Sequence, residues 1–74
     1  MNITELRYLV AIRKWGSVSA AAKQLYAAQP NVSKALKNLE EEYGIRMFGP
    51  SSTGMVPPQQ GGHFIRQSER VLEE

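Results

Sequence analysis

Side chains that can hydrogen-bond to bases and phosphates are concentrated between residues 29 and 37. The amide of Gln29 can pair in bidentate fashion with adenine, and Lys34 can donate to guanine O6/N7 or to a phosphate. Asn31 could pair as Gln29 does, and the alternative is a merely solvated side chain. Lys37 suits a phosphate contact better than base reading, and the hydroxyl of Ser33 can donate to a phosphate. This group of amides, amines and hydroxyls predicts contacts with nucleic acid.

Two further serines lie at the expected start of a helix. A helix N-terminus presents free N–H groups and a partial positive charge, which together can hold a phosphate. Ser17 and Ser19 could add hydroxyl donors there, and either could instead supply the oxygen that caps the helix. Both interpretations stay open for these two residues.

Residue types that other chemistries need are missing or isolated. The sequence has no cysteine and a single histidine, His63, which excludes Cys-ligated metal sites, His-pair metal sites and a Cys–His dyad. Neighbouring residues of a helix diverge, so the three glutamates at 40–42 indicate a solvated turn rather than paired catalytic carboxylates. The glycine pair at 61–62 lacks the lysine and serine of a phosphate-binding loop. We therefore expect a protein that is not an enzyme and has no cofactor or metal.

Length and charge are those of a small binding domain. The 74 residues allow one domain with one small core. Residues 1–38 hold six Lys or Arg against one Glu, a net charge of +5, whereas residues 39–74 hold three Arg against six Glu, a net charge of −3. A basic half indicates a polyanionic partner, with a solvated basic face as the alternative. The sequence shows no membrane-spanning run and no signal peptide, so we expect a cytoplasmic protein.

Helical periodicity predicts two helices ahead of the polar stretch. The first covers residues 3–14, with Asn2 or Thr4 as its cap and Gly16 as its end. Its amphipathic spacing, with Ile12 on the flank, is set by Ile3, Leu6, Leu9, Val10 and Arg13. The second covers residues 20–25 and is rich in alanine, the best helix former. Trp15 and Tyr26 are expected to complete the small core rather than to stack on bases.

A third helix carries the polar stretch itself. It is predicted over residues 29–43, with Pro30 in its first turn and Gly44 just past its end. At about 100° per residue, one face of this helix is apolar and should be buried. It is formed by Val32, Leu36, Leu39 and Tyr43. The opposite face contains Pro30, Lys34 and Lys37, and is basic toward the N-terminus of the helix.

The remaining sequence predicts a hairpin and a last helix. Two short apolar pieces flank a Gly- and Ser-rich loop between residues 45 and 60, which is typical of a small β-hairpin. From residue 63 onward, helical spacing returns. One side of this helix is apolar, and little of the domain is left to bury it, which indicates a partner helix. This side consists of Phe64, Ile65, Ser68, Val71 and Leu72.

These elements together predict a mainly α winged helix-turn-helix, made of three helices plus a small β-hairpin wing and followed by the start of a linker helix. The three-residue link at 26–28 is the connection that the helix-turn-helix uses. The sequence resembles the N-terminal domain of LysR-type transcriptional regulators across about residues 1–62. The resemblance is carried by Leu6-Arg7-Tyr8, Gly16-Ser17, Ser19-Ala20-Ala21-Ala22, Leu25, Gln29-Pro30, Val32-Ser33-Lys34, Leu36, Leu39-Glu40, Gly44, Phe48 and Gly61.

The resemblance implies a homodimer on double-stranded DNA, with the third helix in the major groove. It implies a DNA-binding domain over residues 1–58, with the helix-turn-helix at about 18–37, and a dimerising linker helix that begins in residues 59–74. By similarity, Gln29, Pro30, Ser33 and Lys34 occupy positions that contact bases and phosphates, and position 31 varies with the target sequence. The family's larger inducer-binding domain is absent from these residues, so we expect a fragment without a small-molecule inducer site.

Three positions depart from the family pattern. Ala28 stands where a Ser or Thr hydroxyl usually caps the recognition helix. Pro50 and Thr53 stand where the wing commonly carries arginines, one of which reaches the minor groove, so Thr53 is the wing residue expected nearest DNA. The pair Pro57-Pro58 replaces Leu-Thr at the end of the wing.

Two classes of function follow from this sequence. The first is sequence-specific DNA binding in transcription regulation. The second is a helix-turn-helix used as a protein-interaction module, for which the arginine-poor wing and acidic second half would argue. The two differ in salt dependence, because binding driven by phosphate contacts weakens steeply as salt rises.

Overall fold

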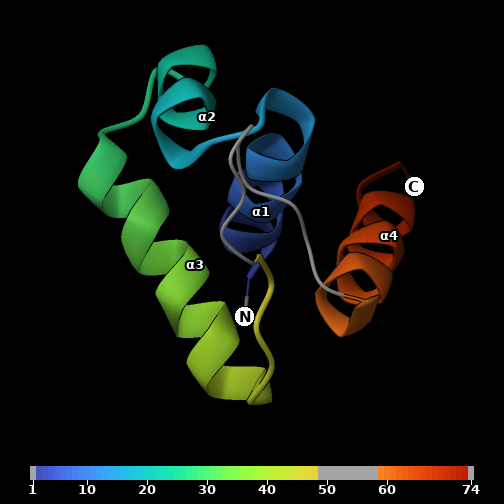
Figure 1. Cartoon of the computed structure of the whole chain (residues 1–74). Coiled ribbons are helices and arrows are strands. Elements are labelled where there is room, and N and C mark those ends of the chain that lie inside the picture. Colours follow the sequence, from blue (N-terminus) through green and yellow to red (C-terminus); the bar gives the residue numbers. More distant parts are fainter. Residues whose placement is uncertain (1, 49–58, 74) are drawn as a thin grey trace.

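The computed structural model describes residues 2–48 and 59–73, which contain four helices (Figure 1). They are α1 (Ile3–Trp15), α2 (Val18–Gln24), α3 (Gln29–Tyr43) and α4 (Gln59–Glu73). Helix α1 is central and packs against each of the other three, and α2 also packs against α3. The helical fold predicted from the sequence is confirmed, whereas the expected hairpin wing, with Thr53, falls in residues 49–58, outside the described residues.

Local capping sets the two ends of α1. The Asn2 side chain accepts a hydrogen bond from the Glu5 backbone N–H at 2.8 Å. Gly16 ends the helix with φ of 87°, a left-handed conformation that glycine adopts without a Cβ penalty. The sequence predicted the end at Gly16 and left Asn2 and Thr4 as alternative caps, of which the structure shows Asn2.

The buried side of α1 differs from the predicted stripe. Ile12 is fully buried although it was expected on the flank, and Ala11 is buried too, whereas Ile3 is 48% exposed. The reason is tertiary: α1 contacts three helices, so its buried arc is wider than one stripe and shifts toward residues 9–12. Trp15 and Tyr26 do not complete the core as expected, since they are 44% and 98% exposed.

Alanines make the contact of α2 with its neighbours possible. Ala21 and Ala22 are buried, and their small side chains let α1 and α3 approach closely. The Ser17 side chain caps the helix by accepting from the Ala20 backbone N–H at 3.0 Å. Ser19 lies inside the first turn and is exposed, so Ser17 is the capping residue.

Helix α3 keeps the predicted bounds and the predicted buried direction. Val32 and Leu39 are fully buried, Ala35 joins them, and Leu36 is half-buried. Gly44 ends the helix with φ of 66°. Ala28 has the extended backbone of an N-cap but contributes no side-chain hydrogen bond, which costs about 1 kcal/mol relative to a Ser or Thr cap.

Tyr43 is less buried than the predicted stripe implied. It is 40% exposed, and its ring packs against Phe64 of α4 with 4.8 Å between the ring centroids and 51° between the planes. Partial desolvation and the neighbouring Glu42 carboxylate raise the pKa of the Tyr43 phenol above its ordinary value of 10.0. The phenol is therefore neutral at physiological pH.

A short irregular segment, residues 45–48, ties the end of α3 to the core. Met47 and Phe48 are buried, and the Met47 backbone N–H donates to Oε2 of Glu40 at 2.8 Å. Glu40 was predicted in a solvated turn, which is wrong: its side chain is half-buried and holds this segment.

Helix α4 begins at Gln59, four residues before its predicted start, and includes both glycines. A Cβ built on Gly61 would lie 2.5 Å from the Met47 carbonyl oxygen, 2.6 Å from the Arg46 carbonyl oxygen and 2.7 Å from the Met47 Cα. The low helix propensity of glycine led to the later predicted start. Close packing against residues 46–47 overrides that propensity.

Candidate nucleic-acid interface

The outer side of α3 presents the polar residues that the sequence singled out. Each is exposed, and the fully buried Val32 and Leu39 lie on the other side of the helix. The exposed set consists of Gln29, Pro30, Asn31, Ser33, Lys34 and Lys37. One helix therefore holds these side chains at the surface in a fixed order, with the core anchoring it from behind.

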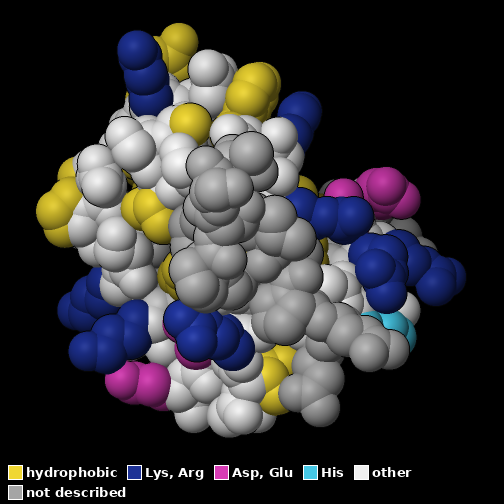
Figure 2. All heavy atoms as spheres, in the orientation of Figure 1, with side chains coloured by type: hydrophobic (Ala, Val, Ile, Leu, Met, Phe, Trp, Pro, Cys, Tyr) yellow, Lys and Arg dark blue, Asp and Glu magenta, His cyan; other side chains and the backbone are white. Residues whose placement is uncertain are grey.

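The charge around this surface has one sign. No Asp or Glu occurs between Glu5 and Glu40, so residues 6–39 carry only cationic charges. In Figure 2, Lys and Arg side chains lie over the middle of α3, and acidic side chains lie toward its C-terminal end. The N-terminal half of α3 is therefore the part suited to a polyanion.

The two helix N-termini of the helix-turn-helix differ in their caps. At α2, the Ser17 oxygen accepts from Ala20, and its O–H remains able to donate. At α3, Ala28 offers only its backbone carbonyl, which accepts from the N–H groups of Asn31 and Val32 at 3.0 and 3.3 Å. Capping accounts for Ser17, and Ser19 keeps an exposed hydroxyl in the first turn of α2.

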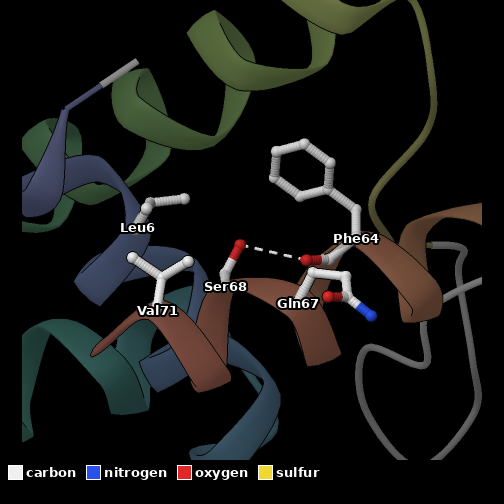
Figure 3. Close-up of a pocket in the computed structure, with 5 residues that line it drawn as sticks. All are labelled: Leu6, Phe64, Gln67, Ser68 and Val71. Carbon is white, nitrogen blue, oxygen red and sulfur yellow. Dashed lines mark hydrogen bonds between the residues drawn. The ribbon is translucent and has the colours of Figure 1, made fainter. Parts of the chain in front are cut away.

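The apolar side of α4 is largely satisfied within the single chain. Ile65 is fully buried and Ser68 is 4% exposed, because α4 lies along α1. The Ser68 hydroxyl donates to the Phe64 carbonyl at 3.0 Å (Figure 3). The sequence expectation that the whole stripe awaits a partner is therefore wrong for Ile65 and Ser68.

The rest of the α4 stripe remains accessible. Val71 is 54% exposed, and Phe64 and Leu72 are half-buried. An open apolar groove of about 160 Å³ runs between α1 and α4 (Figure 3). It is lined by Leu6, Phe64, Gln67, Ser68 and Val71.

An ion pair between Arg13 of α1 and Glu69 of α4 also joins the two helices. Sequence patterns could not predict this ion pair, because the two residues are 56 positions apart.

Metal and membrane sites are also absent from the part of the chain that the structure describes. Residues 2–48 and 59–73 contain no group of three His, Cys, Asp or Glu side chains that could hold a metal ion. None of the described helices is long and apolar enough to cross a membrane.

Comparison with known proteins defines the family. The family described as "Bacterial regulatory helix-turn-helix protein, lysR family" matches residues 3–61. The chain belongs to this LysR family of bacterial regulators. It is 36% identical to the HTH-type transcriptional regulator TfdS of Cupriavidus pinatubonensis. The matched 73 residues are 99% of this chain and 25% of that protein. It is also 34% identical to the HTH-type transcriptional regulator BsdA of Bacillus subtilis, in a match that includes 97% of this chain and 25% of that protein.

Solved structures with the same fold include complexes with DNA. The CbnR_DBD–DNA complex matches with a TM-score of 0.90 and 30% identity, over 99% of this chain and 84% of that chain. The BenM_DBD/benA site 1 DNA complex matches with a TM-score of 0.92 and 34% identity, over 99% of this chain and 85% of that chain. The chain spans about a quarter of the length of the curated relatives it matches.

Proposed function

We propose that this chain binds double-stranded DNA sequence-specifically in transcription regulation, with α3 as the helix that enters the major groove. The observation that carries the proposal is the exposed row of polar and basic side chains on α3, at the cationic end of a LysR-family fold. Related domains of this fold were solved in complex with DNA. The protein-interaction alternative is not favoured, because that row offers donors and acceptors rather than an apolar surface.

Within the row, the residues have different roles. Gln29 and Asn31 read base edges through their amides, and Lys34 donates to guanine or to a phosphate. Pro30 lies exposed in the first turn of the helix, where it faces the DNA, and Ser33 donates to a phosphate. Ser19 and Ser17 contribute hydroxyl donors at the start of α2. Thr53, which the sequence predicts in a wing, lies outside the described residues.

Lys37 is assigned to the phosphate backbone. The substitution Lys37→Ala is expected to weaken binding to all duplex sequences alike, because a phosphate contact carries no base information. Loss of one phosphate contact per subunit should also lower the slope of log affinity against log salt by about one unit per subunit. Fluorescence anisotropy with one duplex at several salt concentrations measures both effects.

Arg70→Ala is the matched control for Lys37→Ala. It removes the same charge from an exposed position on α4, away from α3. If Lys37→Ala changed the preferred sequence, or left the salt slope at the value of the Arg70→Ala control, the assignment of Lys37 to a phosphate would be wrong.

We further propose that the chain acts as a homodimer on a dyad site, through the accessible part of α4. One recognition helix reads few base pairs, and a second copy about one helical turn away adds the rest. Phe64, Val71 and Leu72 supply the apolar contact, and each large side chain contributes about 1.5–3 kcal/mol when buried. That gain is comparable to the cost of association, about 4–15 kcal/mol, so the isolated chain should dimerise weakly.

Val71→Lys tests the dimer surface. Val71 is 54% exposed in the single chain, so the substitution should leave the fold intact and place a charge in the interface. We expect weaker self-association in sedimentation equilibrium and lower DNA affinity, although Val71 lies on α4 and not on the recognition helix. Equal association of Val71→Lys and the unaltered chain would place the interface elsewhere.

A further inference from the structure

The turn between α2 and α3 contains a tyrosine in a conformation that usually belongs to glycine. Tyr26 has φ of 53°, in the left-handed region, and follows the C-cap Leu25 of α2. The Ala27 N–H donates to the Ala22 carbonyl at 2.9 Å, and the Tyr26 N–H donates to the Lys23 carbonyl at 3.3 Å. These two bonds form a Schellman motif, whose left-handed position glycine normally fills.

Packing within the chain does not offset the strain at Tyr26. A side chain in the left-handed region crowds the following carbonyl, and such outliers persist where the surroundings or a function require them. Yet the Tyr26 side chain is 98% exposed, the highest value among the exposed large hydrophobic residues. A large aromatic ring is therefore held in solvent at a position where glycine would be less strained.

The position of this ring in the fold indicates its partner. Tyr26 lies two positions before Ala28, the N-cap of α3, a span of at most about 7 Å. The turn therefore adjoins the end of α3 that carries Gln29, as Figure 1 shows. In Figure 2, basic and hydrophobic side chains lie side by side at this end of the molecule.

Charge favours an anionic partner such as DNA over a basic or neutral surface of a protein. Lys23 is exposed one turn before Tyr26, and no acidic residue occurs between residues 6 and 39. A cation beside an aromatic phenol fits the sugar-phosphate backbone, because the cation pairs with one phosphate, the phenol donates to the next, and the ring covers the sugar.

We propose that Tyr26 is a positioning residue that contacts the DNA backbone beside the bases that α3 reads. Its phenol O–H donates to a phosphate oxygen, and the strained turn fixes the ring at the start of the recognition helix. The proposal rests on the proposed function, since it assigns one more contact to the same DNA site.

Two substitutions of Tyr26 separate this role from a structural one. Tyr26→Gly relieves the left-handed strain, so the melting temperature of the free chain should rise by about 4 °C. The same variant should bind DNA about tenfold more weakly. Tyr26→Phe keeps the ring and loses only the hydroxyl, and should weaken binding by about threefold with the salt slope unchanged, because a neutral phenol releases no counterion.

The probe is a labelled duplex of mixed sequence, about 30 base pairs long, which is long enough to accommodate two subunits one helical turn apart. Binding is measured by anisotropy with the full 74-residue chain. Tyr43→Phe, which removes a phenol hydroxyl at the far end of α3, is the control and should leave affinity unchanged.

The outcomes distinguish the Tyr26 contact from DNA binding by α3. Increased stability together with weaker binding in Tyr26→Gly supports the contact. Unaltered affinity in both Tyr26 variants overturns the assignment of Tyr26 and leaves DNA binding by α3 intact. No binding of the unaltered chain to any duplex overturns the proposed function itself.

Discussion

Replacing Gly61 by alanine is expected to destabilise the chain by about 3 kcal/mol, a large part of the stability of so small a domain. The added Cβ would lie 2.5–2.7 Å from three backbone atoms of residues 46–47. Backbone cannot rotate away as a flexible side chain can, so α4 or the 45–48 segment must shift. The gain in helix propensity from glycine to alanine, about 1 kcal/mol, is smaller than this cost. Urea denaturation measures the change.

Gly16→Ala is the comparison that isolates the clash at Gly61. A Cβ on Gly16 meets nothing within 4 Å, and only its left-handed φ of 87° is unfavourable for alanine. We expect Gly16→Ala to cost about 1 kcal/mol. Equal losses at the two glycines would mean that α4 does not pack against the 46–47 backbone as closely as described.

Gln29→Ala is expected to have the largest effect on sequence recognition. Loss of a bidentate amide–adenine pair should cost about 1–3 kcal/mol at one position of each half-site, and preference among the four bases there should relax. The fold should be unaffected, since Gln29 is exposed at the first turn of α3. Selection of duplexes from a randomised pool, compared between the variant and the unaltered chain, reads this preference directly.

The matched control is Gln67→Ala, which removes the same amide from an exposed position on α4. It should leave the selected sequence as it was. If Gln29→Ala selects the same bases as Gln67→Ala, Gln29 does not read a base.

The parts of the fold that the sequence predicted well depend on local interactions. Asn2 begins its helix, and Gly16 and Gly44 end theirs, through contacts within a few residues, so the residue types were sufficient to predict them. The exposed side of α3 was also predicted, because its buried Val32 and Leu39 follow helical spacing.

What the sequence missed depends on contacts between distant segments. Ile12 is buried because α1 contacts three helices, and Ile65 is buried because α4 returns to α1. Glu40 was predicted to be solvated, because the sequence does not show that the Met47 N–H donates to its carboxylate. Tyr26 was expected in the core, whereas the Schellman turn leaves it exposed to solvent. The start of α4 was missed because glycine has a low helix propensity, and the sequence does not show that Gly61 packs against residues 46–47.

The central claim is that this chain recognises a DNA sequence through the outer side of α3. The most direct test is selection of duplexes from a randomised pool by the 74-residue chain at one fixed salt concentration. We expect enrichment of two related half-sites about one helical turn apart, with affinity that falls as salt rises. A selected pool indistinguishable from the starting pool would contradict it.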